Sequence, residues 1–280
     1  MCLVAKPQGP TSHDVVDIVR RALGLSRVGH LGTLDPFAEG LLVVVVGRAT
    51  RLAPYAAGWK KHYDGVIRLG AVTTTDDRTG EVTRTSEGWR ALDLDQIRGA
   101  AAGLMGEIEQ RPPAFSAVKV DGVRAYKKAR RGEAVAVTPR RVTVFELAIT
   151  GWNAPDVTFR STVSGGTYLR SLARDLGERL GCGGHLAVLR RTAVGLFRLD
   201  DAVPAQALTP SHIKDPALLV SDLPHRALDA GEREAIVHGR PLPAGDTEQG
   251  TVALTADGCL LAVGEVVNRQ IKPRLVLADR

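Results

Sequence analysis

The stretch GHLGTLDPFAEGLLVVVV, residues 29–46, joins a glycine-containing loop to an uninterrupted apolar run. The six apolar residues at 41–46 include four consecutive valines, and β-branched residues favour strands. A run of this length bounded by a turn is typical of a buried strand, and it is too short to span a bilayer. We therefore expect a strand anchored in the core to begin here.

The carboxylate of Asp35 lies in the loop that leads into this strand, and Pro36 stiffens the chain directly after it. The loop contains Gly29, Gly32 and Gly40, which permit φ > 0 or a close backbone approach. A loop anchored to a core strand can hold an acid rigidly at the rim of a cleft, which suits catalysis. The ordinary alternative is that Asp35 only caps a turn or a helix, as Asp-Pro often does.

Working outward, hydrophobic periodicity predicts alternating helices and strands on both sides of the loop. Thr11 or Ser12 can cap the first helix, which Gly24 would end. Helices are expected at 14–24, 92–106, 165–181 and 229–239, with a basic helix after a DG turn near 122. Strands are expected at 61–70, 140–150, 156–164, 185–197, 251–255, 260–267 and 273–278.

The composition changes near residues 210–224, where prolines and polar residues indicate a linker. We therefore predict two domains, a first domain at 1–220 with a basic insertion at about 119–141, and a small, mainly β domain at 221–280. The first domain carries the positive charge: 124–141 holds seven basic residues against one acid. The C-terminal segment from residue 222 has a net charge of −2.

The overall charge of +6 and the isoelectric point near 9.5 favour a polyanionic partner, nucleic acid above all, over a merely solvated basic face. The N-terminus lacks the apolar core of a signal peptide, so a cytoplasmic location is expected. Three widely spaced cysteines fit a reducing compartment without disulfides, and neither cysteines nor histidines show metal-ligand spacing.

Six segments in order resemble the TruB family of tRNA pseudouridine synthases. They are KPQGPTS, GHLGTLDPFAEGLL, KHYDGVIRLG, TDDRTGEV, PPAFSAVKVDGVRAYKKARRG and SGGTYLRSLARDLGERLGCGGHLAVLRR. The resemblance implies an α/β (α+β) catalytic domain with a mixed, largely antiparallel sheet flanked by helices, followed by a PUA-like β domain. It also implies isomerisation of uridine-55 in the tRNA T-loop to pseudouridine.

The same resemblance implies the catalytic residues. Asp35 matches the family's catalytic aspartate, and Arg170 matches the arginine that pairs with it. Tyr63 matches the tyrosine that stacks on the target base. Desolvation would raise the pKa of an aspartate, and a neighbouring guanidinium would oppose that rise. Whether the carboxylate attacks C1′, adds at C6 or assists glycal formation stays open at this point.

Further residues are implied to bind substrate. His30 resembles a histidine that wedges into the T-loop, Tyr168 a second active-site tyrosine, and Leu189 an apolar contact to the base. Lys6 is expected near the active-site rim, where it could support the catalytic loop or touch phosphate. The basic helix, with Lys127 and Lys128, would follow the tRNA backbone. Without the resemblance, each of these has an ordinary core, loop or surface explanation.

The isomerisation adds and removes no group, so we expect no cofactor and no metal. The expected partner is tRNA through its T-loop and T-stem, with no membrane and no guide RNA, and a monomer suffices. Two alternatives stay open: a guide-RNA-dependent, dyskerin-like pseudouridine synthase, and a non-catalytic tRNA-binding or tRNA-folding protein. The short C-terminal domain and the insertion at 119–141 argue against the first, and the set of Asp35, Tyr63 and Arg170 argues against the second.

Overall fold

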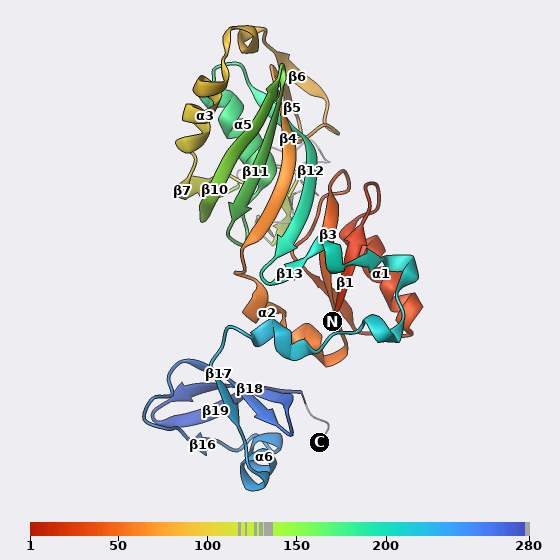
Figure 1. Ribbon diagram of the computed structural model, residues 1–280, viewed down its shortest axis with the longest axis vertical. Coiled ribbons are helices and arrows are strands. Elements are labelled where there is room, and N and C mark those ends of the chain that lie inside the picture. The colour runs from red at the N-terminus through yellow and green to blue at the C-terminus, as the bar shows by residue number, and fades with distance from the viewer. Residues whose placement is uncertain (117–118, 121, 126–127, 129–130, 132–136, 278–280) are drawn as a thin grey trace.

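The computed structural model describes residues 1–116, 119–120, 122–125, 128, 131 and 137–277. Its described part forms an elongated molecule with a large sheet at one end and a small β-sheet near the C-terminus at the other (Figure 1). Strands β1 and β3 of the large sheet lie with the first helix in the middle of the molecule in this view. No helix in the described residues is long and apolar enough to cross a membrane.

The large sheet has ten strands and is mixed. Its order is β14-β1-β3-β12-β4-β11-β10-β7, with β2 added to β3 and β13 to β12. The β1–β14 and β3–β12 pairs are parallel, and the other pairs are antiparallel. The strands are β1 (Cys2–Lys6), β2 (Val28–Leu31), β3 (Glu39–Val46), β4 (Lys61–Leu69), β7 (Gly106–Gln110), β10 (Arg140–Asn153), β11 (Asp156–Val163), β12 (Gly184–Val194), β13 (Phe197–Arg198) and β14 (Val203–Pro204).

The apolar run that predicted a buried strand is buried on both faces in β3. Leu41, Val43 and Val45 belong to one hydrophobic cluster, and the alternate residues Leu42, Val44 and Val46 belong to another. Alternation of side chains across a strand produces this division. Helix α1 (Ser12–Leu23) packs on the second cluster. Its cap is Thr11, and Gly24 ends it with a φ of 64°, because a left-handed residue there costs glycine little.

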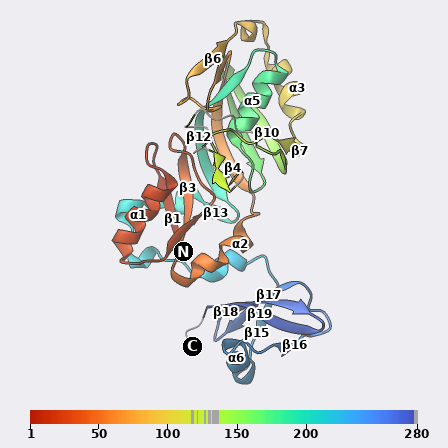
Figure 2. The ribbon, with the colours of Figure 1, turned by 180° about the vertical axis from the view of Figure 1, so that it is seen from behind.

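Helices also cover the remaining part of the sheet, on the face that is turned toward the viewer in Figure 2. Helix α5 (Leu169–Arg179) and helix α3 (Leu94–Ala102) pack against β4, β10 and β11 through one large apolar cluster. Helix α3 ends earlier than its pattern predicts, because Gly103 follows it, and Met105 is 44% exposed. A second difference is that residues 28–31, expected as loop, form β2 and pair with β3, which buries Leu31 opposite Val43.

Short elements complete the first part of the chain. Hairpins are formed by β5 (Ala71–Thr73) with β6 (Val82–Thr85) and by β8 (Lys119–Val120) with β9 (Val123–Arg124). Most of the basic helix expected after β9 falls outside the described residues. The remaining short helices are α2 (Ala53–Ala56), η1 (Gly47–Leu52), η2 (Gly88–Ala91), η3 (Leu199–Asp201), η4 (Ala205–Ala207), η5 (Pro210–His212) and η6 (Pro216–Val220).

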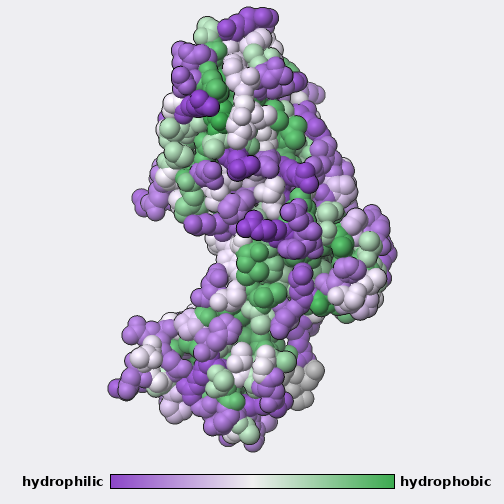
Figure 3. Space-filling view, viewed as in Figure 1, coloured by the Kyte–Doolittle hydropathy of each residue, from purple (hydrophilic) through white to green (hydrophobic). Residues whose placement is uncertain are grey.

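The C-terminal β domain is a five-stranded sheet with one helix. A DG turn at Asp257-Gly258, both at positive φ, joins two of its strands as expected. Its inner residues share an apolar cluster with η6 and with Leu52 and Ala56 of the first half. Apolar surface also gathers at the waist above this domain in Figure 3. Its elements are β15 (His225–Ala227), α6 (Ala230–Val237), β16 (Leu242–Pro243), β17 (Thr251–Ala256), β18 (Cys259–Val267) and β19 (Gln270–Val276).

The predicted fold class is therefore confirmed: a mixed, largely antiparallel sheet flanked by helices, followed by a small β domain. The boundary at 220/221 and the PUA-like character of the second domain stay predictions.

Candidate active site

A pocket of about 840 Å³ opens where the loop after β2 meets β4, β12 and the start of α5. It collects residues that are far apart in the sequence, because the β3, β12 and β4 strands are neighbours in the sheet. Six of the nine site residues expected from the sequence line it: His30, Asp35, Tyr63, Tyr168, Leu189 and Arg170. The pocket is therefore the candidate active site.

The N-terminal segment holds the Asp35 loop from both sides. Lys6 donates from Nζ to the carbonyl of Ala38 at 2.6 Å, and Gly9 donates its backbone N–H to the carbonyl of Pro36 at 2.8 Å. The Ser12 hydroxyl bonds both the N–H of Leu34, at 2.9 Å, and its carbonyl, at 3.0 Å. These contacts explain what KPQGPTS does here: it fixes the backbone on either side of the acid.

Lys6 is 2% exposed, and burial lowers its pKa to about 8. Its ammonium is occupied by the carbonyl of Ala38 in the Asp35 loop and by that of its neighbour Pro7. Of the two roles considered for Lys6, its position therefore favours support of the loop over contact with phosphate.

The side chains of Asp35 and Arg170 form an ion pair at the pocket wall. Arg170 Nη2 donates to Asp35 Oδ1 at 3.2 Å, and Arg170 Nε lies 2.9 Å from Oδ2. The Nε–H is not directed at any acceptor, so the pair is held by one directed hydrogen bond and by charge. Arg170 is only 5% exposed, whereas the Asp35 side chain keeps 33% of its surface open.

Three further acceptors hold Arg170 in place. Its Nη1 donates to the carbonyl of Thr75 at 2.9 Å, and its Nη2 donates to the carbonyl of Phe115 at 2.9 Å. The carboxylate of Asp77 lies 3.5 Å from Nη1. The arginine that lies off the apolar stripe of α5 is thus buried by the loop between β5 and β6 and by residue 115, and its orientation toward Asp35 is fixed.

Burial and charge act in opposite directions on Asp35. Desolvation raises the pKa of Asp35 above its ordinary value, and Asp77 raises it further. The Arg170 guanidinium and, more weakly, Lys6 oppose that rise. A buried carboxylate favours its neutral form unless a cation offsets the lost hydration. Arg170 is therefore the group that keeps Asp35 available as an anion.

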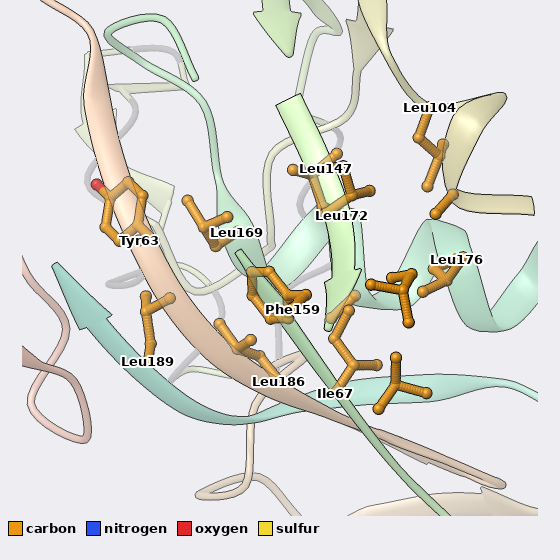
Figure 4. Close-up of a cluster of buried hydrophobic side chains, with 14 of the residues drawn as sticks. Tyr63, Ile67, Leu104, Leu147, Phe159, Leu169, Leu172, Leu176, Leu186 and Leu189 are labelled. Atoms are coloured by element: carbon orange, nitrogen blue, oxygen red, sulfur yellow. The ribbon is translucent and has the colours of Figure 1, made fainter. Parts of the chain in front are cut away.

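Tyr63 and Leu189 form the apolar wall of the pocket. Figure 4 shows Tyr63 at one end of the large hydrophobic cluster, beside Leu189 and Leu169, with its hydroxyl directed away from the other labelled side chains. All three residues line the pocket. Tyr63 is 5% exposed and belongs to the core cluster, so packing fixes its ring, and the residue also lines the pocket. An aromatic ring held in this way can contribute a stacking contact to a planar base.

Tyr168 lies directly before α5 and lines the pocket. The buried amide of Gln110 holds its backbone, accepting from the N–H at 2.8 Å and donating to the carbonyl at 3.1 Å. The Arg140 guanidinium lies 5.8 Å from its ring centroid, a cation–π distance.

His30 lies on β2 at the pocket. Its Nε2 is 3.2 Å from the Thr33 hydroxyl, and its ring meets that of His13 edge to face with 5.9 Å between centroids. Burial, and then the charges of His13 and Arg191, lower the pKa of His30 to about 4. The ring is consequently neutral at pH 7 and can pack against a base without the cost of a buried charge.

Besides Lys6, which lies behind the Asp35 loop, the expected site residues that are not in the pocket lining are those of the basic helix. Lys127 lies outside the described residues, and Lys128, although described, is not among the residues that line the pocket. A role for Lys127 and Lys128 with tRNA stays a prediction.

Three pocket or near-pocket charges escaped the sequence reasoning: Asp77, Lys61 and Arg191. A usable signal existed for two of them. Lys61 is two residues from Tyr63 on β4, and Arg191 is two residues from Leu189 on β12, so each shares a sheet face with an expected site residue. Asp77 had only its place in TDDRTGEV. Among the described residues, no cluster of His, Cys, Asp or Glu has the arrangement of a metal site.

Two family comparisons match the catalytic half. Residues 20–169 match the N-terminal domain of TruB family pseudouridylate synthases, and residues 170–220 match the C-terminal domain of tRNA pseudouridylate synthase B.

Full-length relatives agree. The tRNA pseudouridine synthase B of Thermobifida fusca (strain YX) is 46% identical, covering 99% of this chain and 97% of the relative. That of Mycobacterium sp. (strain KMS) is also 46% identical, covering 98% of this chain and 95% of the relative. That of Parasynechococcus marenigrum (strain WH8102) is 44% identical over 98% and 96%.

Solved structures share the fold. A Cbf5-Nop10-Gar1 complex contains a chain that superposes with a TM-score of 0.74 at 26% identity, covering 98% of this chain and 83% of that one. The archaeal box H/ACA sRNP Nop10-Cbf5 complex gives a TM-score of 0.73 at 26% identity, covering 100% and 86%. Sequence matches over nearly the whole length and a shared fold lead to one conclusion: this chain belongs to the TruB family of pseudouridylate synthases and is an isomerase.

Proposed function

We propose that this protein converts uridine-55 in the T-loop of tRNA to pseudouridine. The observation that carries the proposal is the Asp35–Arg170 ion pair, partly open to a pocket whose other wall is Tyr63 and Leu189. The relatives named tRNA pseudouridine synthase B, matched over nearly their whole length, support tRNA as the substrate.

The reaction breaks the N1–C1′ bond of uridine, rotates the uracil and forms a C5–C1′ bond. The hydrogen on C5 leaves as a proton and N1 gains one, so atoms and electrons balance without a co-reactant. The base must leave its stack first, because C1′, C5 and C6 are shielded in a folded loop. The pocket provides space for the extruded nucleotide.

Asp35 supplies the negative charge that each route requires, whether it attacks C1′, adds at C6 or stabilises a cation-like sugar on the way to a glycal. Arg170 fixes the carboxylate and favours its ionised form. Tyr63 and Leu189 hold the detached uracil by stacking, which is worth roughly 1–3 kcal/mol per base. The short distances from Lys6, Gly9 and Ser12 to the loop mean that this geometry exists before substrate arrives.

His30 and the basic helix complete the proposed tRNA contacts. A neutral His30 at the pocket would pack into the space that the flipped base leaves, holding the loop open. Lys127 and Lys128 would contact backbone phosphates, which gives affinity rather than sequence readout. We place the enzyme in the cytoplasm as a monomer that acts without a guide RNA.

Site mapping tests this proposal directly. Purified protein is incubated with an unmodified tRNA transcript and no other RNA, and pseudouridine is located by chemical adduct formation and primer extension. Modification at uridine-55 alone is the expected result. No modification without added guide RNA would favour the dyskerin-like alternative, and tight binding without any modification would favour the non-catalytic one.

The matched control is Asp35→Asn assayed on the same tRNA. It separates catalysis by this pocket from a contaminating synthase, because the variant should bind tRNA and leave every uridine unmodified. Pseudouridine at a different position would retain the enzyme class and overturn the assignment of the site.

A further inference from the structure

Two basic side chains share one wall of the pocket and are not used by the chemistry described above. Lys61 is the first residue of β4, and Arg191 lies on β12 directly across from Tyr63. Both line the pocket, and both are buried. A Cβ placed on Gly32 would lie 3.4 Å from Arg191 Nη1 and 3.7 Å from Lys61 Nζ, so the two cations face a common point.

Neither cation has an acidic partner among the described residues. Arg191 is 0% exposed and donates from Nε to the carbonyl of Leu41, at 2.7 Å, and from Nη2 to the carbonyl of Gly32, at 2.9 Å. Its Nη1 is fully buried and has no acceptor. Burial and the nearby Arg191 charge lower the pKa of Lys61 to about 8. Two buried cations without a counter-ion are unfavourable, and an anion would relieve both.

The other cations of the site are already occupied. Arg170 contacts Asp35, Asp77 and two backbone carbonyls, and Lys6 bonds the carbonyls of the Asp35 loop. Among the described residues of the pocket wall, Lys61 and Arg191 are thus the two cations that have neither an acidic partner nor a full set of hydrogen-bond acceptors. Position 32 keeps their common space open, because Gly32 has a φ of 70° and any side chain there would start 2.9 Å from Lys61 Cε.

We propose that Lys61 and Arg191 Nη1 bind a backbone phosphate that flanks the flipped uridine. This rests on the proposed function, since the pocket then receives a nucleotide whose only anionic groups are its two phosphodiester linkages. The carbonyl of Gly32 orients the Arg191 guanidinium, and the phosphate supplies the acceptor that Nη1 lacks. Holding the phosphate on one wall and the base on Tyr63 fixes C1′ between them, in reach of Asp35.

A binding cycle in the inactive Asp35→Asn protein tests this subsite. The probe is a synthetic T-arm hairpin with one neutral methylphosphonate linkage, placed 5′ or 3′ of the target uridine. The adjacent ribose carries a 2′-O-methyl group in both this probe and its ordinary phosphate counterpart. For one of the two positions, the neutral linkage should weaken binding about 10-fold, and Lys61→Met should weaken binding of the ordinary hairpin by a similar factor. Combining the two should cost little more than either alone, because both remove one interaction.

Matched controls exclude general charge effects. Lys60→Met removes the same charge one residue away on the exposed side of the chain, and should change the affinity less than about two-fold. A methylphosphonate in the stem should add to the effect of Lys61→Met without coupling. The slope of log Kd against log salt should fall by about 0.7 for Lys61→Met and stay constant for Lys60→Met.

The outcomes are separable. Additive effects of Lys61→Met and the neutral linkage at both positions would overturn the subsite, as would an unchanged affinity for both neutral linkages. The comparison between the methylphosphonate and the phosphate hairpin changes only the RNA, so its result holds even where a protein variant is unstable. In parallel, the release of tritium from C5 measures how far the unaltered protein converts the ordinary hairpin. If the hairpin is converted but Lys61→Met and the neutral linkage show no coupling, only this inference is overturned. If the hairpin is not converted, the proposed function itself is overturned.

Discussion

The catalytic half and the C-terminal β domain bury different kinds of side chain. In the described residues, every buried polar or charged side chain lies between Lys6 and Arg191, and none lies in the β domain. Several charges of the β domain pair at the surface, as in Arg233–Asp257 and Arg269–Asp246, and Arg226 forms partly exposed pairs with Glu232 and Glu248. Its interior is apolar, around Leu254 and Ile271.

This difference separates stability from chemistry. Burying a charge is costly, and exposed ion pairs contribute little. The catalytic half carries that cost where a carboxylate must be held beside a substrate, whereas the β domain is free to use apolar burial alone. Substitutions in the catalytic half should therefore change the conversion of tRNA, whereas substitutions in the β domain should change the free energy of unfolding. Four experiments test this difference, in order of their expected effect on tRNA conversion.

The largest effect is expected for Asp35→Asn. It keeps the shape of the side chain but removes the negative charge, so tritium release from C5-labelled uridine in tRNA should fall by at least about 1000-fold. Filter binding should give a Kd within about three-fold of that of the unaltered protein, because the basic surface is untouched. Residual turnover above one per cent would remove Asp35 from the mechanism.

Arg170→Gln should reduce the rate about 100-fold at pH 7, since Asp35 loses both its orientation and its counter-ion. The sign of the pH effect is defined. Asp35 must be ionised, and burial already raises its pKa, so the single-turnover rate falls as the pH drops through that raised value. Loss of Arg170 raises the pKa further, which should move the acid limb upward by about one pH unit or more.

The control for this shift is Arg160→Gln, which removes a guanidinium from an exposed pair with Asp64. Its rate and acid limb should match those of the unaltered protein. Identical acid limbs for Arg170→Gln and Arg160→Gln would show that Arg170 does not tune Asp35.

Reversing charge in the basic helix, with Lys127→Glu and Lys128→Glu together, should weaken tRNA binding about 10-fold at 0.1 M salt and flatten the salt dependence. The matched reversal in the β domain is Arg269→Glu with Lys272→Glu, both exposed. We expect less than a two-fold change there, because the domain is net acidic. Equal losses from the two reversals would mean that both domains meet RNA phosphates.

The smallest effect on conversion is expected from Leu254→Ala in the β domain. Leu254 is fully buried, so truncation should lower the free energy of unfolding by about 2–5 kcal/mol. At 25 °C, kcat/KM should stay within two-fold of its original value. Leu196→Ala, at a position that is 49% exposed, serves as the stability control. A folded Leu254→Ala protein with much lower kcat/KM would couple the β domain to catalysis.

Local patterns predicted much of the fold. The unbroken apolar run at 41–46 indicated a buried strand, and β3 is buried, with alternate side chains in two apolar clusters. Thr11 and Gly24 marked the ends of α1. These features depend on near neighbours in the chain, which is why a sequence pattern can show them. The predicted helix at 92–106 was continued through a local glycine, Gly103, at which α3 ends, whereas β2 forms because of its pairing partner β3, which lies outside the local window.

By itself, the sequence indicated the helices α1, α3, α5 and α6 and most of the long strands, and its motifs indicated the family and Asp35 as the candidate catalytic carboxylate, but it did not show β1 or β7. Only the tertiary structure decided which charges are buried and what they face. Asp35 and Arg170 are 135 residues apart and meet because α5 packs behind the sheet. Arg190 and Arg191 look alike in the sequence, yet one is exposed and the other fully buried. The reason is physical: the cost of a charge depends on the partners and the solvent around it, and the folded chain supplies both.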